Sequence, residues 1–421
     1  MIEIGILACF LTWIGLLLYS VSARRYLVAL YLLCYSVPFL GLVRGMWAEQ
    51  VVLWPIGNYT FDVDASIVAR LTCVWSLGLA GSVGAMAFSN LVERLSVTGP
   101  RLLLLELKAV RYWAWFFFCV SLCYVAARAL MPEQVFAVFT GVESFAVCAI
   151  LVFFSYALLL GRFWPLVASL LLAFGYAYAN IRTGDRDFVV LFVAMMLGGL
   201  FYWSRYIAFK SLMLIGVLAV GVLASGVYVS MVRMDVPMTE ENISQYLLFN
   251  SWNAIILPMV DQLTNHWYGD HLKYGKTYFD MIVSMAPSPI YTYFGAIKPI
   301  TLDNPADWYY IYGLGGMHAA GVGFENFGLA GVVLDVFFGV VLLLLLDRRS
   351  EEHSYLRYLL FMLISASVMH WLWYGAMYML NMLMFFVLFV VLVWVTKMVT
   401  SALPRGAVDQ SEGASFIHHG S

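Results

Sequence analysis

Charge is what this sequence has little of. Only 11% of its 421 residues are charged and its mean hydropathy is +0.86, whereas soluble domains carry about 25% charged residues. So few charges cannot cover a water-exposed surface, and we expect lipid to be the solvent for most of the chain. The formal net charge of −2 also lacks the basic footprint of a protein that binds nucleic acid.

Cysteine chemistry is equally sparse. The six cysteines lie inside apolar runs, where neither metal-ligand spacing in a polar setting nor a disulfide framework is readable. The first apolar run contains Glu3 and has no basic segment before it, so no cleavable signal peptide is expected. The pair His418 and His419 belongs to a polar tail and is not interpreted as a metal site. We expect neither a metal nor another cofactor.

Apolar runs of membrane length are what the chain has in abundance. Runs of about 20 residues predict an all-α, polytopic membrane bundle of about eleven helices, at 3–21, 26–45, 64–89, 111–130, 138–160, 164–181, 187–204, 211–230, 320–346, 356–378 and 380–399. The expected organisation is an N-terminal bundle of about eight spans (1–230), a large loop with short helices (231–319), three C-terminal spans (320–400) and a disordered tail (401–421).

Lysine and arginine set the expected orientation. With eleven spans, fourteen of the 23 lysines and arginines fall on one side of the membrane and nine on the other. The richer side is expected to be cytoplasmic. The N-terminus and the 231–319 loop then lie outside, and the C-terminal tail lies inside.

The segment from Met231 to Gly315 is the least membrane-like part of the chain. It is polar, rich in tyrosine, tryptophan, proline and glycine, and about 85 residues long. Loops longer than about 15 residues are usually functional or disordered, and this one is too aromatic to be disordered. We expect it to fold as a cap on the outer face, with most of its aromatic side chains in an interfacial belt.

Cations on the outer side gather at helix ends. Arg182 and Arg186 flank a turn between two spans, in which Gly184 permits positive φ. A guanidinium group matches phosphate oxygens with two parallel donors, so converging arginines at the interface suit a lipid pyrophosphate. Asp185 and Asp187 offer the alternative of a local salt-bridged turn. The other outer cations considered for this ligand are Arg70, Arg233 and Lys276.

Three patterns between about 175 and 345 carry a family resemblance. They are Arg182-Thr-Gly-Asp-Arg186 before a span, Tyr274-Gly-Lys-Thr-Tyr278 before a turn with Pro287, and Gly321-Val-Gly-Phe-Glu-Asn-Phe-Gly328-Leu-Ala-Gly331. In their order and topological placement they resemble the bacterial O-antigen polymerases, the Wzy-type oligosaccharide repeat-unit polymerases. One departure is Val322, because family members often have glutamate there, four residues before Asn326; the nearby carboxylate is Glu325.

The resemblance implies a reaction. These enzymes join undecaprenyl-pyrophosphate-linked oligosaccharides at the periplasmic face of the inner membrane, by transferring the growing glycan to a hydroxyl of an incoming repeat unit. The pyrophosphate leaving group needs cations, and the hydroxyl needs a base. The implied enzyme uses no nucleotide and no metal, and it works with membrane lipid and with a chain-length-regulating co-polymerase.

Side-chain chemistry and the resemblance together assign roles. His318 is the candidate base, since its ordinary pKa of about 6.5 suits proton transfer, and a packing role is its alternative. Arg182 and Arg186 complete the predicted catalytic set, as contacts of the pyrophosphate. His370 is either a substrate contact or an intramembrane hydrogen-bonding residue. The predicted substrate-binding residues are Arg70, Arg233, Lys276, Glu325 and His370.

Other functions use a similar chain. An O-antigen ligase would transfer finished polymer to lipid A core with the same donor chemistry. A transporter or flippase is disfavoured because the chain has no internal repeat and no matched pair of Gly/Pro-broken spans. A structural scaffold is disfavoured by the outer arginines.

Overall fold

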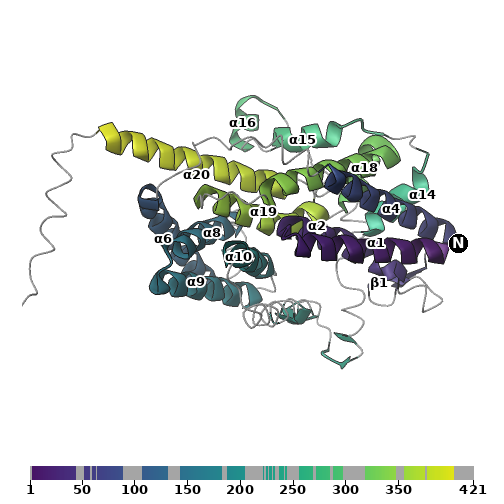
Figure 1. Cartoon of the computed structure of the whole chain (residues 1–421), viewed down its shortest axis with the longest axis horizontal. Helices are drawn as coiled ribbons and strands as arrows, with labels where there is room; N and C mark the ends of the chain where they lie inside the picture. Colours follow the sequence, from purple (N-terminus) through teal and green to yellow (C-terminus); the bar gives the residue numbers. More distant parts are fainter. Residues whose placement is uncertain are drawn as a thin grey trace, which may run out of the picture.

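Long apolar runs become long helices (Figure 1). The computed structural model describes residues 2–43, 52–56, 59–62, 64–88, 107–130, 143–182, 187–203, 256–268, 272–284, 288–296, 318–347, 355–374 and 377–402, with short pieces between 221 and 243. Within this part, eight helices are long and apolar enough to cross a membrane, and two more apolar helices are shorter. The prediction of a helical bundle with many apolar helices of membrane-spanning length is confirmed.

The long helices are α1 (Ile2–Ser22), α2 (Tyr26–Ser36, continued by the 3-10 turn η1, Val37–Phe39), α4 (Ala65–Ala87), α6 (Leu107–Leu130), α9 (Phe163–Arg182), α18 (Ala319–Asp347), α19 (Tyr355–Tyr374) and α20 (Met377–Ala402). The shorter apolar helices are α8 (Glu143–Leu160) and α10 (Asp187–Trp203). Ten of the predicted spans coincide with these helices to within a few residues. The predicted span 211–230 falls almost wholly outside the described residues, as does the polar tail beyond 402.

Strand structure is the departure from an all-α fold. β1 (Val52–Ile56) and β2 (Tyr59–Asp62) pair antiparallel, with Pro55 opposite Thr60. Valine, tryptophan, tyrosine and phenylalanine favour strands, and Gly57-Asn58 between the strands is a turn-forming pair. The run is too short for a span and lies between two of them, so hydropathy alone does not reveal it.

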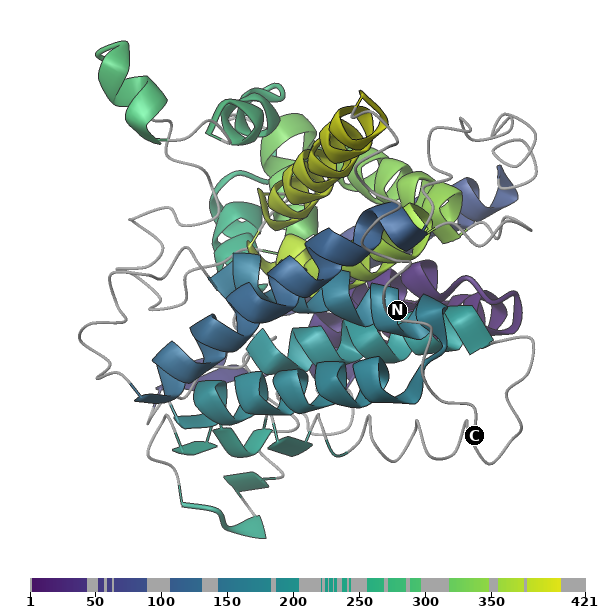
Figure 2. The same cartoon turned by 90° about the vertical axis from the view of Figure 1, so that its left-hand side faces the viewer.

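The helices form two groups joined by a third pair. α1, α2, α4 and α18 pack on one another, and so do α6, α8, α9 and α10. α19 contacts members of both groups and packs along α20 (Figure 1). In the turned view, the yellow α20 runs beside the blue α6 (Figure 2), as the bond from Trp113 Nε1 to Thr396 Oγ1 at 2.9 Å requires.

Glycines allow the closest helix contact in the first group. A Cβ added at Gly81 of α4 would lie 2.7 Å from the carbonyl oxygen of Val333 in α18, so the two backbones approach as small residues permit in membrane helices. At the end of α18, buried Asp347 accepts hydrogen bonds from the amides of Leu27 (3.0 Å) and Val28 (3.1 Å). These amides open α2 and have no helical partner of their own.

In the described part of the segment predicted as the outer loop, the longer helices are α14 (Ile256–Asn265), α15 (Lys276–Ser284) and α16 (Ser288–Tyr293). α14 packs against α4 and α18, whereas α15 packs against α18 and α20. α14 and α15 therefore cover the part of the bundle where α18 begins, and that is where the predicted site residues of α15 and α18 lie.

Candidate functional site at a broken helix

A break in α18 organises the candidate site. Phe327 (φ −139°, ψ 19°) and Gly328 (φ 63°, ψ −149°) leave helical geometry, so residues 319–326 form a short separate arm. Glycine is the residue that enters the Gly328 region without strain. The arm folds back closely on the rest of the helix, because a Cβ added at Gly331 would lie 2.0 Å from the carbonyl oxygen of Gly323.

The segment before α15 docks on the end of this arm. The amides of Lys273 and Tyr274 donate to the carbonyl oxygens of Glu325 and Asn326, both at 3.0 Å. The amide of Gly275 donates to Asn326 Oδ1 at 3.0 Å. Tyr274 (φ 48°) and Gly275 (φ 86°) are left-handed, which turns the chain into α15. These bonds satisfy carbonyls that the break leaves without helical partners, so the two segments are joined by three hydrogen bonds.

Two carboxylates flank the break. Glu325 Oε1 lies 2.5 Å from Lys273 Nζ, with the side chains 12% and 42% exposed respectively. Among the described residues, Glu325 Oε2 is buried and has no hydrogen-bond partner. Asp335, beyond the break, accepts a hydrogen bond from the hydroxyl of Tyr278 at 3.2 Å. We call Lys273, Tyr278, Glu325 and Asp335 the broken-helix site.

Tyr278 of α15 links the two carboxylates electrostatically. Burial, followed by the charge of Asp335 and its hydrogen bond and then by Glu325, raises the pKa of the Tyr278 phenol well above its usual range. The phenol therefore stays protonated and remains a donor. Sequence reasoning placed Tyr278 only in a motif and did not single out Lys273 or Asp335.

Asp335 is the clearest omission, because an ionisable residue inside a span is a functional candidate by default. α2 and α18 run antiparallel: Asp347 bonds the start of α2, and the hydroxyl of Tyr31 lies 3.3 Å from a Cβ added at Gly339. One helical turn further along each helix, Asp335 is level with Tyr35. Tyr31 and Tyr35 are fully buried and stack with their ring centres 6.1 Å apart.

Arg70, a predicted pyrophosphate contact, lies beside this site. Its Nη1 donates to the carbonyl oxygen of Leu263 and, at 3.5 Å, to that of Thr264. The guanidinium carbon lies 5.1 Å from the ring centre of Trp267, and Trp267 stacks on Phe324 of the arm, with centres 6.1 Å apart and planes inclined by 23°. Arg70 thus donates to carbonyls in the last turn of α14. It contacts the arm indirectly, because its guanidinium packs on Trp267 and Trp267 stacks on Phe324.

His318, the predicted base, is fully buried at the start of the arm. Its Nε2 lies 3.0 Å from the carbonyl oxygen of Tyr35, and its Nδ1 lies 3.2 Å from the amide nitrogen of Ala320. A carbonyl only accepts and an amide only donates, so Nε2 carries the hydrogen, Nδ1 accepts one, and the ring is neutral. The ring also packs against those of Tyr35 and Phe39, with centres 4.9 and 5.2 Å away.

Two further predicted residues lie around the start of α10. Arg182 Nη1 donates to the carbonyl oxygen of Ala129, at the end of α6, at 2.7 Å. His370 Nε2 lies 3.6 Å from Asp187 Oδ1, and its ring stacks on Tyr378 with centres 4.6 Å apart. Arg182 and His370 therefore belong to the α9–α10–α19 region, whereas Arg70, Lys276, His318 and Glu325 belong to the region around the arm.

Of the remaining predicted cations, the structure describes Lys276 but not Arg186 or Arg233. Lys276 is largely exposed in the first turn of α15, and its Nζ lies 2.9 Å from Asp280 Oδ2. Arg186 and Arg233 lie outside the described residues. Of the three described cations expected to contact pyrophosphate, two bond carbonyls at helix ends and the third pairs with a carboxylate, so each already has a protein partner.

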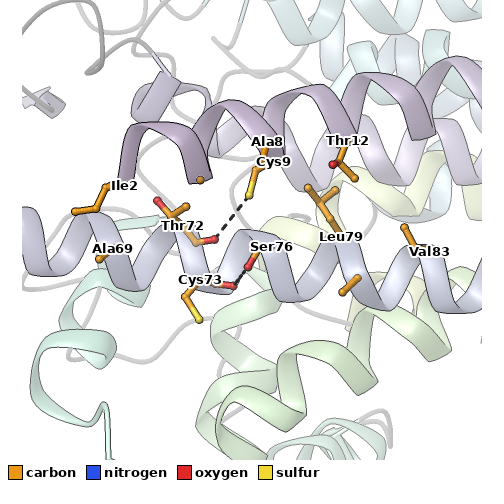
Figure 3. Close-up of a pocket in the computed structure, with 12 residues that line it drawn as sticks. Ile2, Ala8, Cys9, Thr12, Ala69, Thr72, Cys73, Ser76, Leu79 and Val83 are labelled. Atoms are coloured by element: carbon orange, nitrogen blue, oxygen red, sulfur yellow. Dashed lines mark hydrogen bonds between the residues drawn. The ribbon is translucent and has the colours of Figure 1, made fainter.

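A cavity of about 740 Å³ lies between α1 and α4 (Figure 3). Its lining is small and mostly apolar, including Gly5, Ala8 and Cys9 of α1 and Ala69, Thr72 and Cys73 of α4. Cys9 Sγ donates to the carbonyl oxygen of Thr72 at 3.9 Å. None of the twelve lining residues carries a charge, so this cavity supplies neither a carboxylate nor a cation.

Within the described ranges, no three or more histidine, cysteine, aspartate or glutamate side chains gather in a way that could hold a metal ion. The site therefore consists of an ion-paired carboxylate, a second carboxylate held by a phenol, and nearby cations and aromatic rings. Comparisons of the chain with protein-family models, with curated proteins and with solved structures find no match.

Proposed function

We propose that this protein polymerises lipid-linked oligosaccharides at the periplasmic face of a bacterial inner membrane. In this proposal it transfers a growing glycan from undecaprenyl pyrophosphate to a hydroxyl of an incoming repeat unit, as in O-antigen biosynthesis. The observation that carries the proposal is the broken-helix site: a carboxylate with one free oxygen, beside cations and stacked aromatic rings, in an otherwise apolar helical bundle.

Membrane physics supports a functional reading of the break. Non-helical backbone at membrane depth is tolerated where protein buries it or where it lines a polar cavity. Here the backbone amides of Lys273 and Tyr274 donate to carbonyls at the break, and the amide of Gly275 donates to the side chain of Asn326. A continuous helix would need none of them. Retaining a break and two carboxylates in an apolar helix is costly, and a reaction that needs polar groups next to lipid gives a reason for it.

The proposed reaction needs the groups that gather here. A pyrophosphate that gains charge as it leaves is stabilised by cations in a low-dielectric site, and Arg70, Lys273 and Lys276 are the described cations nearest to the arm. Arg182, Arg186 and Arg233 are the further cations of the proposal, and His370 remains a proposed substrate contact. A sugar ring can stack on an aromatic side chain such as Trp267. The lipid carrier remains in the bilayer throughout.

A deletion strain tests the function. Glycolipids are extracted from cells that lack this gene and from cells with the gene restored on a plasmid. Polymerase activity predicts that the deletion retains glycolipid carrying a single repeat unit and loses every longer chain, and that the plasmid restores the long chains.

Two other outcomes would point elsewhere. Loss of all chains from lipid A core, with long polymer kept on the lipid carrier, would indicate a ligase. Retention of single repeats on the cytoplasmic leaflet alone would indicate a flippase. A chain-length-regulating co-polymerase is the proposed protein partner, and its removal should change polymer length while polymerisation continues.

A further inference from the structure

We propose that Glu325, through Oε2, accepts the proton of the attacking hydroxyl, and that Lys273 is the positioning residue that holds Oε1. This inference rests on the proposed function and names the base of that reaction. It replaces the assignment of His318, which the sequence favoured for its ordinary pKa.

Both ring nitrogens of His318 are already hydrogen-bonded within the protein, so neither is available to accept a proton from a substrate. Its Nε2–H is directed at the carbonyl oxygen of Tyr35 and its Nδ1 lone pair accepts from the amide of Ala320. Taking a proton on Nδ1 would place two donors face to face, and the neighbouring rings of Tyr35 and Phe39 leave the side chain fully buried. The histidine fixes the first turn of the arm to α2, which is a structural task.

Glu325, unlike His318, has one side-chain atom that no protein group occupies in the described part of the chain. One oxygen is held by Lys273 at 2.5 Å, whereas the other is buried with no partner in the described part of the chain. Buried polar atoms are almost always hydrogen-bonded, and one that is not requires an explanation. An oxygen left free to receive a hydroxyl hydrogen from a substrate is such an explanation.

The surroundings of Glu325 fix its position. Its own backbone carbonyl is bonded by the amide of Lys273, so the residue that holds the side chain also holds the main chain. Among the described residues, His266, which follows α14, and Tyr278 of α15 interact with it electrostatically from other elements. Two contacts from one lysine restrict the carboxylate to one orientation, which is what a base must have before substrate arrives.

The chemical step balances with the groups named. The acceptor oxygen forms a bond to the anomeric carbon of the growing glycan while its proton moves to Glu325 Oε2. The bond from that carbon to the pyrophosphate oxygen breaks, and its electron pair leaves with the lipid pyrophosphate. The proton then passes from Glu325 to solvent, so the carboxylate is restored. No oxidant, reductant or nucleotide is required.

The test uses full-length protein in membranes of the deletion strain, supplied with single-repeat glycolipid extracted from that strain. Glu325→Gln should lower the rate of polymer formation at least about 100-fold, because general bases contribute roughly 100- to 10,000-fold. Glu325→Ala should be equally slow, and added formate should restore part of its activity, since a small carboxylate can occupy the space that the truncated side chain leaves. Glu240→Gln, the same exchange at an exposed glutamate, should match wild type.

A conservative variant separates catalysis from folding. Glu325→Asp keeps the charge and can still pair with flexible Lys273, but it withdraws the carboxylate by one methylene. It should fold as wild type does and be at least about tenfold slower. Lys273→Met should also be slower, and formate should not restore it because its base is still present.

The results distinguish two failures. If wild-type membranes form no polymer from the single-repeat glycolipid, the proposed function is wrong and the inference with it. If wild type polymerises and Glu325→Gln does so within a few-fold, the function stands and Glu325 is not the base. Failure of formate to accelerate Glu325→Ala would likewise assign the glutamate to structure alone.

Discussion

Arg182 has one role that the structure shows and a second, in phosphate binding, that is proposed. One guanidinium nitrogen donates to the carbonyl of Ala129 and helps to finish α6, and the planar fork has further donors for a phosphate. A lysine can still bond one carbonyl but cannot grip a phosphate with two parallel bonds. We therefore expect Arg182→Lys to accumulate and unfold like wild type while polymer falls at least about tenfold. Long chains made normally by Arg182→Lys would show that the residue only caps a helix.

Asp347 makes a prediction about stability alone. Its two carboxylate oxygens accept from the first amides of α2, and an acidic side chain also suits a helix N-terminus. Asp347→Ala leaves two buried donors unpaired, so it should lower the free energy of unfolding by roughly 1–3 kcal/mol. Thermal unfolding of the purified protein in detergent measures the change. Asp347→Asn keeps one acceptor and should fall between the two; equal stability of all three proteins would refute the cap.

At the scale of the element, the break in α18 depends on small residues. A Cβ at Gly331 would meet the backbone oxygen of Gly323 at 2.0 Å, and backbone cannot move aside as a side chain can. Gly331→Ala should cost about 1–3 kcal/mol, the usual range for overpacking, and should open the arm enough to slow polymerisation. Gly15→Ala is the matched control, because nothing lies within 4 Å of a Cβ there. The measurement is the thermal unfolding midpoint of both variants in detergent. Equal midpoints for Gly331→Ala and Gly15→Ala would contradict the close contact.

A substitution at Gly328 tests whether the break in α18 depends on the backbone dihedral angles at this residue. Its φ of 63° with ψ of −149° is a region used almost only by glycine. Gly328→Ala should therefore straighten α18 or strain it, and either change separates Glu325 from the backbone amides that clamp the arm. The expected readout is faster proteolysis between α14 and α15 together with loss of polymer. A variant as resistant to protease as wild type would mean that the arm tolerates a helical link.

The elements that sequence could predict are those set by composition. Spans follow from runs of apolar residues, so their bounds agree with the helices to within a few residues. The hairpin β1–β2 and the break in α18 depend on a few local dihedral angles, which hydropathy does not register. The broken-helix site was harder still, because Lys273 and Glu325 meet only through tertiary docking. Asp335 could have been identified from the sequence, because it is a carboxylate inside a predicted span. The hydrogen bonds of Arg70 and His318 to backbone groups could not have been predicted from the sequence.

At the scale of the whole molecule, the contacts define two ends of the bundle. His318, at the start of α18, lies beside the end of α2, and α14 bonds the start of α4 through Arg70. At the opposite end, Asp347 meets the start of α2. α8 starts near the start of α20, where Cys148 Sγ lies 3.1 Å from Met382 Sδ. α8 therefore ends, at Leu160, on the side where α20 also ends, and Arg162 follows it there.

The orientation predicted from the lysine and arginine bias is testable with two single cysteines. Tyr268, just after α14, is 93% exposed, and Arg162 lies in the exposed link between α8 and α9. The native cysteines lie in apolar runs and should give low background with a charged, membrane-impermeant maleimide. If the broken-helix site faces the periplasm, Tyr268→Cys should label in intact cells and Arg162→Cys only after the membrane is opened. The reverse pattern would put the site in the cytoplasm, where the proposed lipid-linked substrates are not polymerised. Glu325 could then not be the base of the proposed polymerisation, although the geometry around the break would be unchanged.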